Sequence, residues 1–174
     1  MLGKKTVVKI NDGRIVKGFT TDFSPNKDVF HIRSIKNNST GEEGEQVEVS
    51  LDNIKAVFFV KDFLGNKDYK KVRTFEGYES GLPTQRKIIV IFKDGENFYG
   101  TTHSYSPDRK GFFVFPIDER DNNDRVFVTS SALEKVHVKK FGSDNFDVYI
   151  YESWKKYVVS RIKYTANTVG INER

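Results

Sequence analysis

Histidines and clustered carboxylates are the side chains here that could bind a metal ion or transfer protons. The three histidines, His31, His103 and His137, lie in separate stretches. They show neither the HxH nor the HExxH spacing that brings two ligands together. The acidic runs GEEGE and DERDNND lack the glycine and glutamate placement of an EF-hand loop. We therefore expect no metal, no other cofactor and no catalytic acid–base pair.

Nucleophilic catalysis has little support either. The chain has no cysteine, and it lacks the G-x-S-x-G turn that presents a catalytic serine. Ser24 and Ser106 each precede a proline, but no base partner recurs beside both of them. Phosphate-binding glycine loops are also missing from the sequence. The sequence predicts a protein that is not an enzyme, with a small hydrolase as the remotest alternative.

One line of sequence occurs twice. GFTTDFSPNKDVFHI begins at Gly18, and GTTHSYSPDRKGFFV begins at Gly100. Proline followed by Asn or Asp favours a tight turn, and a serine before the proline can accept a backbone hydrogen bond. Folding does not require the basic residue that comes next. Lys27, Arg109 and Lys110 are therefore the candidate partner-binding residues, and the alternative is that both loops are only turns.

The repeated line belongs to a duplicated unit. At one constant offset the identical pairs include Asp12/Asp94, Gly13/Gly95, Gly18/Gly100, Ser24/Ser106 and Pro25/Pro107, and we interpret these ten residues as structural. Beyond a short length change in a polar loop, which folded units tolerate, pairs such as Val57/Val136 continue. We interpret 1–62 and 86–141 as the two copies. Residues 63–85 are an aromatic-containing connector, partly packed on the copies, and 142–174 are a C-terminal helix and tail.

Each copy has the pattern of five short strands. Apolar residues alternate along them, and the NDG and KDG segments are hairpin turns in which glycine accepts a positive φ. Gly18 and Gly100 lie inside strands, where glycine marks a bend or a close backbone approach. After the second copy, apolar residues recur every four positions and predict an amphipathic helix over 144–164, although VYIY would also suit a strand.

These patterns predict a mainly β protein, with two tandem five-stranded SH3-like barrels related by internal duplication and a C-terminal α-helix. The segments VVKINDGRIVKGF and IVIFKDGENFYGT resemble the first motif of Sm-like proteins. The second copy, with GFFVFPID and NNDRVFV, is also similar to an uncharacterised bacterial family.

The Sm-like resemblance implies RNA binding by base stacking and an Asp/Asn pair. The first copy has Ser24 and Asp28 at those positions, and the second has Ser106 and Lys110. The nucleotide pocket of the Sm-like proteins therefore does not carry over to this chain.

Charge and composition limit the classes of partner that the chain is expected to bind. The net charge of +5 is spread along the chain without a basic block, so single-stranded RNA or DNA is the alternative to a protein partner. No apolar run approaches the ~20 residues that span a bilayer, and the N-terminus does not resemble a secretory signal. We expect a cytoplasmic, non-catalytic adaptor or scaffold with no membrane contact. Homo-oligomers could form through the helix or the barrel edges.

Overall fold

The chain folds almost entirely into antiparallel β-structure. The computed structural model describes residues 3–79, 81–151, 158–159 and 164–165. Within these ranges it has 13 strands, two 3₁₀ turns and no α-helix. The elements are β1 (Lys4–Ile10), β2 (Ile15–Thr20), β3 (Val29–Ile35), β4 (Glu43–Ser50), η1 (Leu51–Asn53), β5 (Ile54–Val60), β6 (Arg86–Phe92), β7 (Asn97–Thr102), β8 (Gly111–Pro116), β9 (Asn123–Thr129), η2 (Ser130–Ala132), β10 (Leu133–Lys139), β11 (Asn145–Ile150), β12 (Val158–Val159) and β13 (Tyr164–Thr165).

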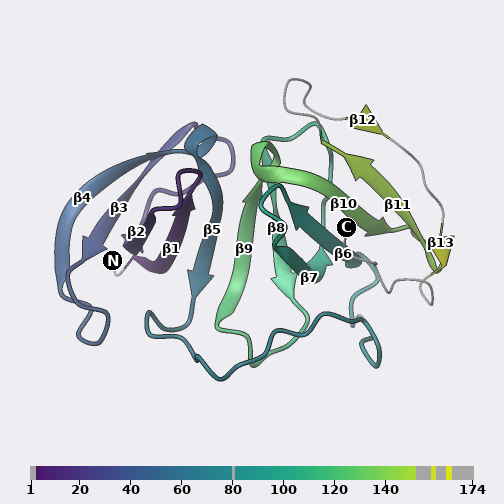
Figure 1. Ribbon diagram of the computed structural model, residues 1–174, viewed down its shortest axis with the longest axis horizontal. Helices are drawn as coiled ribbons and strands as arrows, with labels where there is room; N and C mark the ends of the chain where they lie inside the picture. The colour runs from purple at the N-terminus through teal and green to yellow at the C-terminus, as the bar shows by residue number, and fades with distance from the viewer. Residues whose placement is uncertain (1–2, 80, 152–157, 160–163, 166–174) are drawn as a thin grey trace.

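Both copies of the duplicated unit have the same strand order. Neighbouring strands run β5-β1-β2-β3-β4 in the first copy and β10-β6-β7-β8-β9 in the second. Figure 1 shows the two copies side by side, the first in purple and blue and the second in teal and green, with β5 next to β9. The duplication in the sequence therefore corresponds to two equivalent five-stranded units.

The prediction of two closed barrels is wrong. Closure would require the fourth and fifth strands of each copy to pair. Among the described strands β4 pairs only with β3, and β9 pairs with β5 of the other copy rather than with β10. One antiparallel sheet thus joins all the described strands. The physical reason is that β5, IKAVFFV, is buried at every position and needs apolar cover on both faces.

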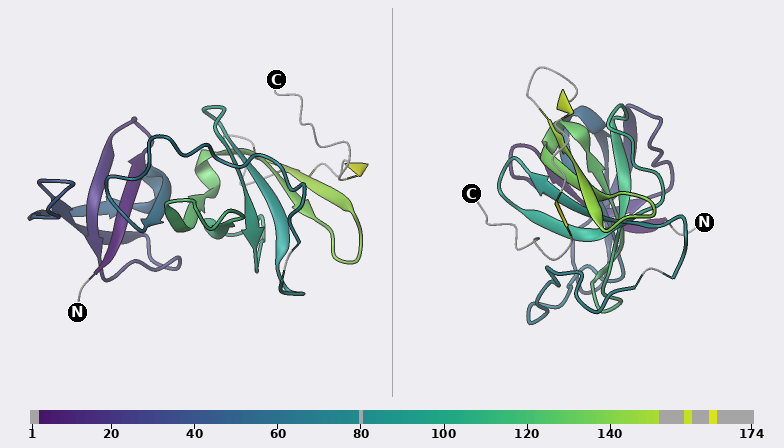
Figure 2. Two further views of the ribbon diagram at one scale, coloured as in Figure 1. Left: turned by 90° about the horizontal axis from the view of Figure 1, so that it is seen from below. Right: turned by 90° about the vertical axis from the view of Figure 1, so that its right-hand side faces the viewer.

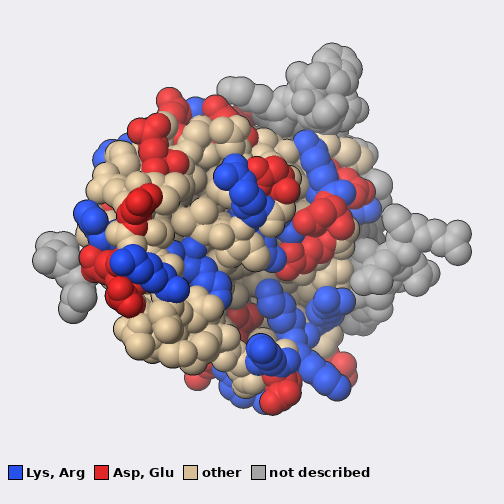
Figure 3. Space-filling model, turned by 60° about the vertical axis from the view of Figure 1, so that its left-hand side comes forward, with Lys and Arg blue, Asp and Glu red and all other residues tan. Residues whose placement is uncertain are grey.

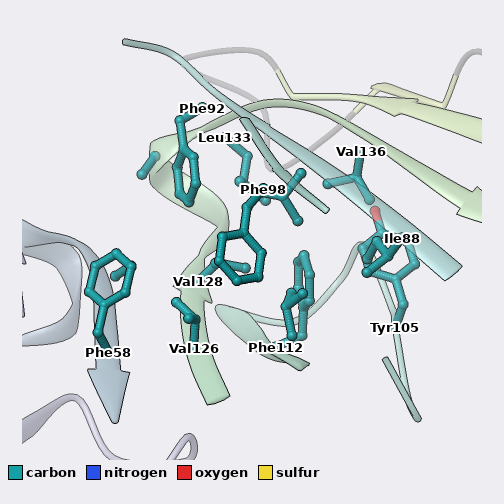
Figure 4. Close-up of a cluster of buried hydrophobic side chains, with 14 of the residues drawn as sticks. Phe58, Ile88, Phe92, Phe98, Tyr105, Phe112, Val126, Val128, Leu133 and Val136 are labelled. Carbon is teal, nitrogen blue, oxygen red and sulfur yellow. The ribbon is translucent and has the colours of Figure 1, made fainter. Parts of the chain in front are cut away.

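Alternate residues of β5 enter two different cores. Val57 and Phe59 belong to the first copy's cluster, which Phe127 of β9 joins. Phe58 belongs to the second copy's cluster, and Figure 4 shows it beside Val126 of β9. Each copy thereby completes the hydrophobic core of the other, and burial of these side chains holds the two units together.

The predicted C-terminal helix is also wrong. Residues Asn145–Ile150 form strand β11, which pairs with β10, and the two-residue strands β12 and β13 pair with β11. Buried Phe146 and Val148 alternate with more exposed neighbours, as in a strand. Aromatic and β-branched residues favour this conformation, and the edge of β10 supplies their hydrogen bonds. The remainder of the predicted helix and tail, 152–157, 160–163 and 166–174, lies outside the described residues.

The connector of residues 63–85 packs on both copies. Phe63 is buried, with its ring centroid 5.3 Å from that of Phe19 in the first copy. Phe75 lies 5.5 Å from Tyr99 in the second copy, measured between ring centroids. The left view of Figure 2 shows the connector running from one copy to the other. Aromatic side chains thus attach this irregular segment to the sheet.

Gly100 lies where a neighbouring strand passes too closely for a side chain. A Cβ at this position would be 2.5 Å from the carbonyl oxygen of Phe115, and Gly18 meets the equivalent backbone of β3. Gly100→Ala is therefore expected to lower the free energy of unfolding by about 1–3 kcal/mol, because backbone must move. Urea denaturation followed by circular dichroism measures this change in the free energy of unfolding. Gly81→Ala, which meets open space, is the control, and equal midpoints for both variants would contradict the close approach.

Candidate functional site

The two Ser-Pro loops form the same kind of turn. In the first copy the backbone N–H of Lys27 donates to the carbonyl of Ser24 at 3.1 Å. The Ser24 hydroxyl also accepts from the N–H of Asn26 at 3.3 Å. In the second copy the N–H of Arg109 donates to the carbonyl of Ser106 at 3.4 Å. Pro25 and Pro107, which follow these serines, hold φ near the value that the turn requires. Turn formation alone accounts for the serines and prolines.

The glycines of the two Asp-Gly turns have the expected conformation. Gly13 and Gly95 have φ of 93° and 84°, values that other residues rarely adopt. The Asp12 and Asp94 side chains accept hydrogen bonds from backbone N–H groups two residues later. These four residues set the hairpin geometry.

One of the Ser-Pro loops reaches across to the other copy. A groove of about 510 Å³ lies between the first loop and β8 with the loop before it. It is lined by Pro25, Asn26, Ser104, Arg109, Lys110, Gly111, Phe112, Phe113 and Phe127. The fold therefore brings the first repeated turn and the basic end of the second one to a single groove.

The three candidate basic residues have different surroundings. Lys110 forms an ion pair with Asp28 of the first copy, and this hydrogen bond raises the pKa of Lys110. Arg109 donates to the Ser104 hydroxyl at 3.5 Å and forms no ion pair with a carboxylate among the described residues. Lys27 does not line the groove, and its ammonium group donates to the carbonyl of Asp22 at 3.5 Å. Arg109 is thus the groove cation whose charge is left for a ligand.

Aromatic rings form the apolar wall of the groove. The ring centroids of Phe113 and Phe127 are 5.3 Å apart with an edge-to-face geometry. Phe23, from the first Ser-Pro loop, contacts both of them, at 6.2 and 5.2 Å. The Arg125 guanidinium stacks 4.6 Å from the Phe113 centroid. The groove therefore combines a cation with aromatic surface, a combination suited to an anionic ligand with apolar parts.

A second groove, of about 750 Å³, lies between the two Asp-Gly turns. Its central cation is the buried Lys55, whose ammonium group is 2.5 Å from both Asp94 and Glu96. Burial acts to raise the pKa of each carboxyl, but the hydrogen bond from Lys55 together with the other hydrogen bonds and the Lys55 and Lys9 charges outweighs burial and lowers both pKa values. Because these charges are already paired across the two copies, we assign this groove to the junction and not to ligand binding.

Phe113 and Phe127 are groove residues that the sequence reasoning missed. The signal that could have found them is a mismatch between the copies. The first copy has His31 where the second has Phe113, and Glu48 where the second has Phe127. A position that is aromatic in one copy and charged in the other indicates a surface that is covered in only one of them.

Comparison with known proteins places the duplicated region in a family. The sequence matches the profile of a family of unknown function, DUF6982, over residues 2–140. The chain belongs to this family. The match spans both copies and ends before β11 begins. No curated protein and no solved structure matches the chain.

The described part of the chain lacks two kinds of feature. It contains no group of three or more His, Cys, Asp or Glu residues placed to hold a metal ion. It also contains no helix with the length and hydropathy that crossing a bilayer requires.

Proposed function

We propose that this protein is a non-catalytic adaptor that binds an acidic, partly apolar segment of a partner protein in the groove between its Ser-Pro loops. The supporting observation is that the repeated line, which is distributed over two distant stretches of sequence, meets at one groove. Arg109 supplies the cation there, and the half-buried Phe113 supplies apolar surface, with the fully buried Phe127 packed against it. A carboxylate of the partner would form a charge-assisted hydrogen bond with the guanidinium.

Arg109→Glu tests this proposal. The probe is an end-blocked, fluorescein-labelled peptide of alternating Glu and Leu, and fluorescence anisotropy measures its dissociation constant. The substitution is expected to weaken binding at least about tenfold, because a hydrogen bond to a charged group is replaced by repulsion. Arg73→Glu, an exposed change in the connector, is the matched control. A Gln/Leu peptide shows how much of the binding depends on charge. Equal affinities for Arg109→Glu and Arg73→Glu would contradict the proposal.

A second candidate function is binding of single-stranded nucleic acid at a different place. A pocket of about 340 Å³ is lined by Arg86, Lys139, Lys140 and Phe141, among others. The Phe141 ring is 61% exposed, and the Arg86 guanidinium lies 4.8 Å from its centroid. Exposed rings beside cations can stack bases. Against this role, Figure 3 shows positive and negative side chains interspersed on the face in view.

Labelled oligo-uridine distinguishes the two functions. Binding with a steep salt dependence that is abolished by Lys140→Glu and unchanged by Arg109→Glu would support the nucleic-acid function. Binding of the Glu/Leu peptide with no binding of oligo-uridine would support the adaptor function.

A further inference from the structure

The two copies expose equivalent strands in different ways. β9, the fourth strand of the second copy, is covered by β5 of the first copy along its outer edge. β4, the fourth strand of the first copy, pairs with β3 on one side and is the last strand of the sheet. Figure 1 shows β4 at the outer side of the molecule. Its outer edge carries backbone N–H and C=O groups to which no described strand is paired, so it can accept a further strand.

The side chains next to these two edges differ in chemistry. In the second copy Phe113 and Phe127 are covered by Phe23 and Phe59 of the first copy. A strand that pairs with β9 therefore meets an aromatic surface, and β5 matches that surface with the apolar side chains of Val57 and Phe59.

The equivalent surface of the first copy is acidic. His31 and Glu48 occupy the positions of Phe113 and Phe127, and Asp22 occupies that of Ser104. The His31 Nδ1 is 2.8 Å from an Asp22 carboxylate oxygen, and its Nε2 is 3.8 Å from a carboxylate oxygen of Glu48. The Glu48 side chain is 73% exposed. A strand that pairs with β4 would meet carboxylates where β5 meets phenyl rings.

The pairing of β5 with β9 also indicates which side chains a strand added to β4 would carry. Val57 is paired with Phe127, and Phe58 with Val126. Val57 faces the first copy's core and Phe58 the second copy's core. On β4 the residues equivalent to Phe127 and Val126 are Glu48 and Val47. The incoming residue opposite Glu48 should therefore be basic, and the residue opposite Val47 should be apolar.

The arrangement at the other end of the sheet indicates whether a second copy of the chain could supply the strand that pairs with β4. β10 is the second copy's equivalent of β5, and it is already paired with β11 through Val136 and Tyr149. Tyr149 packs on Tyr105 with ring centroids 5.1 Å apart, as Phe127 packs on Phe23. Among the described strands, a second copy of the chain thus has none of the β5 type free to pair with β4.

We propose that the free edge of β4 docks an extended segment of a different protein in which basic and apolar residues alternate, added as an antiparallel strand. This surface is separate from the Ser-Pro groove and does not depend on the function proposed for that groove. The carboxylates also make two β4 edges repel one another, so the edge discriminates in favour of a basic strand.

The experiment uses the full chain and an end-blocked peptide of alternating Val and Lys. Isothermal titration calorimetry is expected to show binding that weakens with added salt. Hydrogen exchange should show new protection in Glu43–Ser50 and not in the Ser-Pro loops. A double variant, Asp22→Asn with Glu48→Lys, should weaken binding at least about tenfold, because attraction becomes repulsion. Glu76→Lys, an exposed change in the connector, is the matched control.

Several outcomes would overturn the proposal. They are no binding at peptide concentrations up to about 1 mM, equal binding of a Val/Glu peptide, and protection elsewhere than in β4. Self-association of the protein through β4, seen by sedimentation velocity, would also overturn it in favour of a second copy as the occupant. Because Arg109→Glu leaves β4 unchanged, failure at the Ser-Pro groove and failure at β4 are distinguishable.

Discussion

Phe127→Ala is expected to lower the free energy of unfolding by about 3–5 kcal/mol, the usual range for removing a fully buried phenylalanine. Phe127 is 0% exposed and belongs to the first copy's core, although its strand belongs to the second copy. Its ring contacts Phe23 and Phe113 at centroid distances of 5.2 and 5.3 Å. The substitution therefore leaves a cavity at the junction and removes edge-to-face contacts between the two copies.

The measurement is urea denaturation of the full chain, followed by circular dichroism. Phe141→Ala is the matched control, since Phe141 is 61% exposed and its loss should change the free energy of unfolding by less than about 0.5 kcal/mol. If Phe127→Ala costs less than about 1 kcal/mol, β9 does not hold the two copies together as described.

The stability of the protein should also fall between pH 6.5 and pH 4 because of one buried histidine. His137 on β10 is 6% exposed, and burial, with a smaller contribution from the Lys135 charge, lowers its pKa to about 4. An unfolded chain binds a proton at this residue below pH ~6.5. The folded chain does not bind it until pH is near 4. The unfolded state thus gains protons first, and the free energy of unfolding falls by about 3 kcal/mol over this interval.

His137→Phe isolates this effect from the titration of carboxyl groups. The first copy already has a phenylalanine, Phe58, at the equivalent position, so the ring suits this strand. Urea denaturation of both proteins at a series of pH values should show that the variant loses less stability below pH 6.5, by about 3 kcal/mol at pH 4. Parallel pH profiles of the two proteins would show that His137 does not titrate as described.

The local elements were predictable because their signals lie within a few residues of one another. The Asp-Gly turns have glycines with positive φ at Gly13 and Gly95, since a hairpin of this kind requires it wherever it occurs. The Ser-Pro turns follow from the same local chemistry. The duplication was visible as well, because equivalent strands in the two copies carry equivalent side chains.

The prediction of the C-terminal segment failed because two periodicities overlap in it. Phe146 and Ile150 fit a helix, and Phe146 and Val148 fit a strand. The open edge of β10 selects the strand by offering hydrogen bonds that a short isolated helix does not gain. Nothing within residues 144–151 themselves indicates that this edge exists.

The sequence by itself determined that the chain is a duplicated β-protein with turns at Gly13, Gly95 and the two Ser-Pro pairs. Only the tertiary structure decided how the copies are joined and which residues share a groove. The sheet continues through β5 and β9 because β5 and the second half of β9 are buried on both faces, and burial of those faces depends on partners far away in the chain. The same dependence on distant parts of the chain explains why the sequence predicted only part of the groove. Arg109 could be chosen from its place after a turn, but Phe113 and Phe127 became groove residues only when the first copy's loop was placed over them.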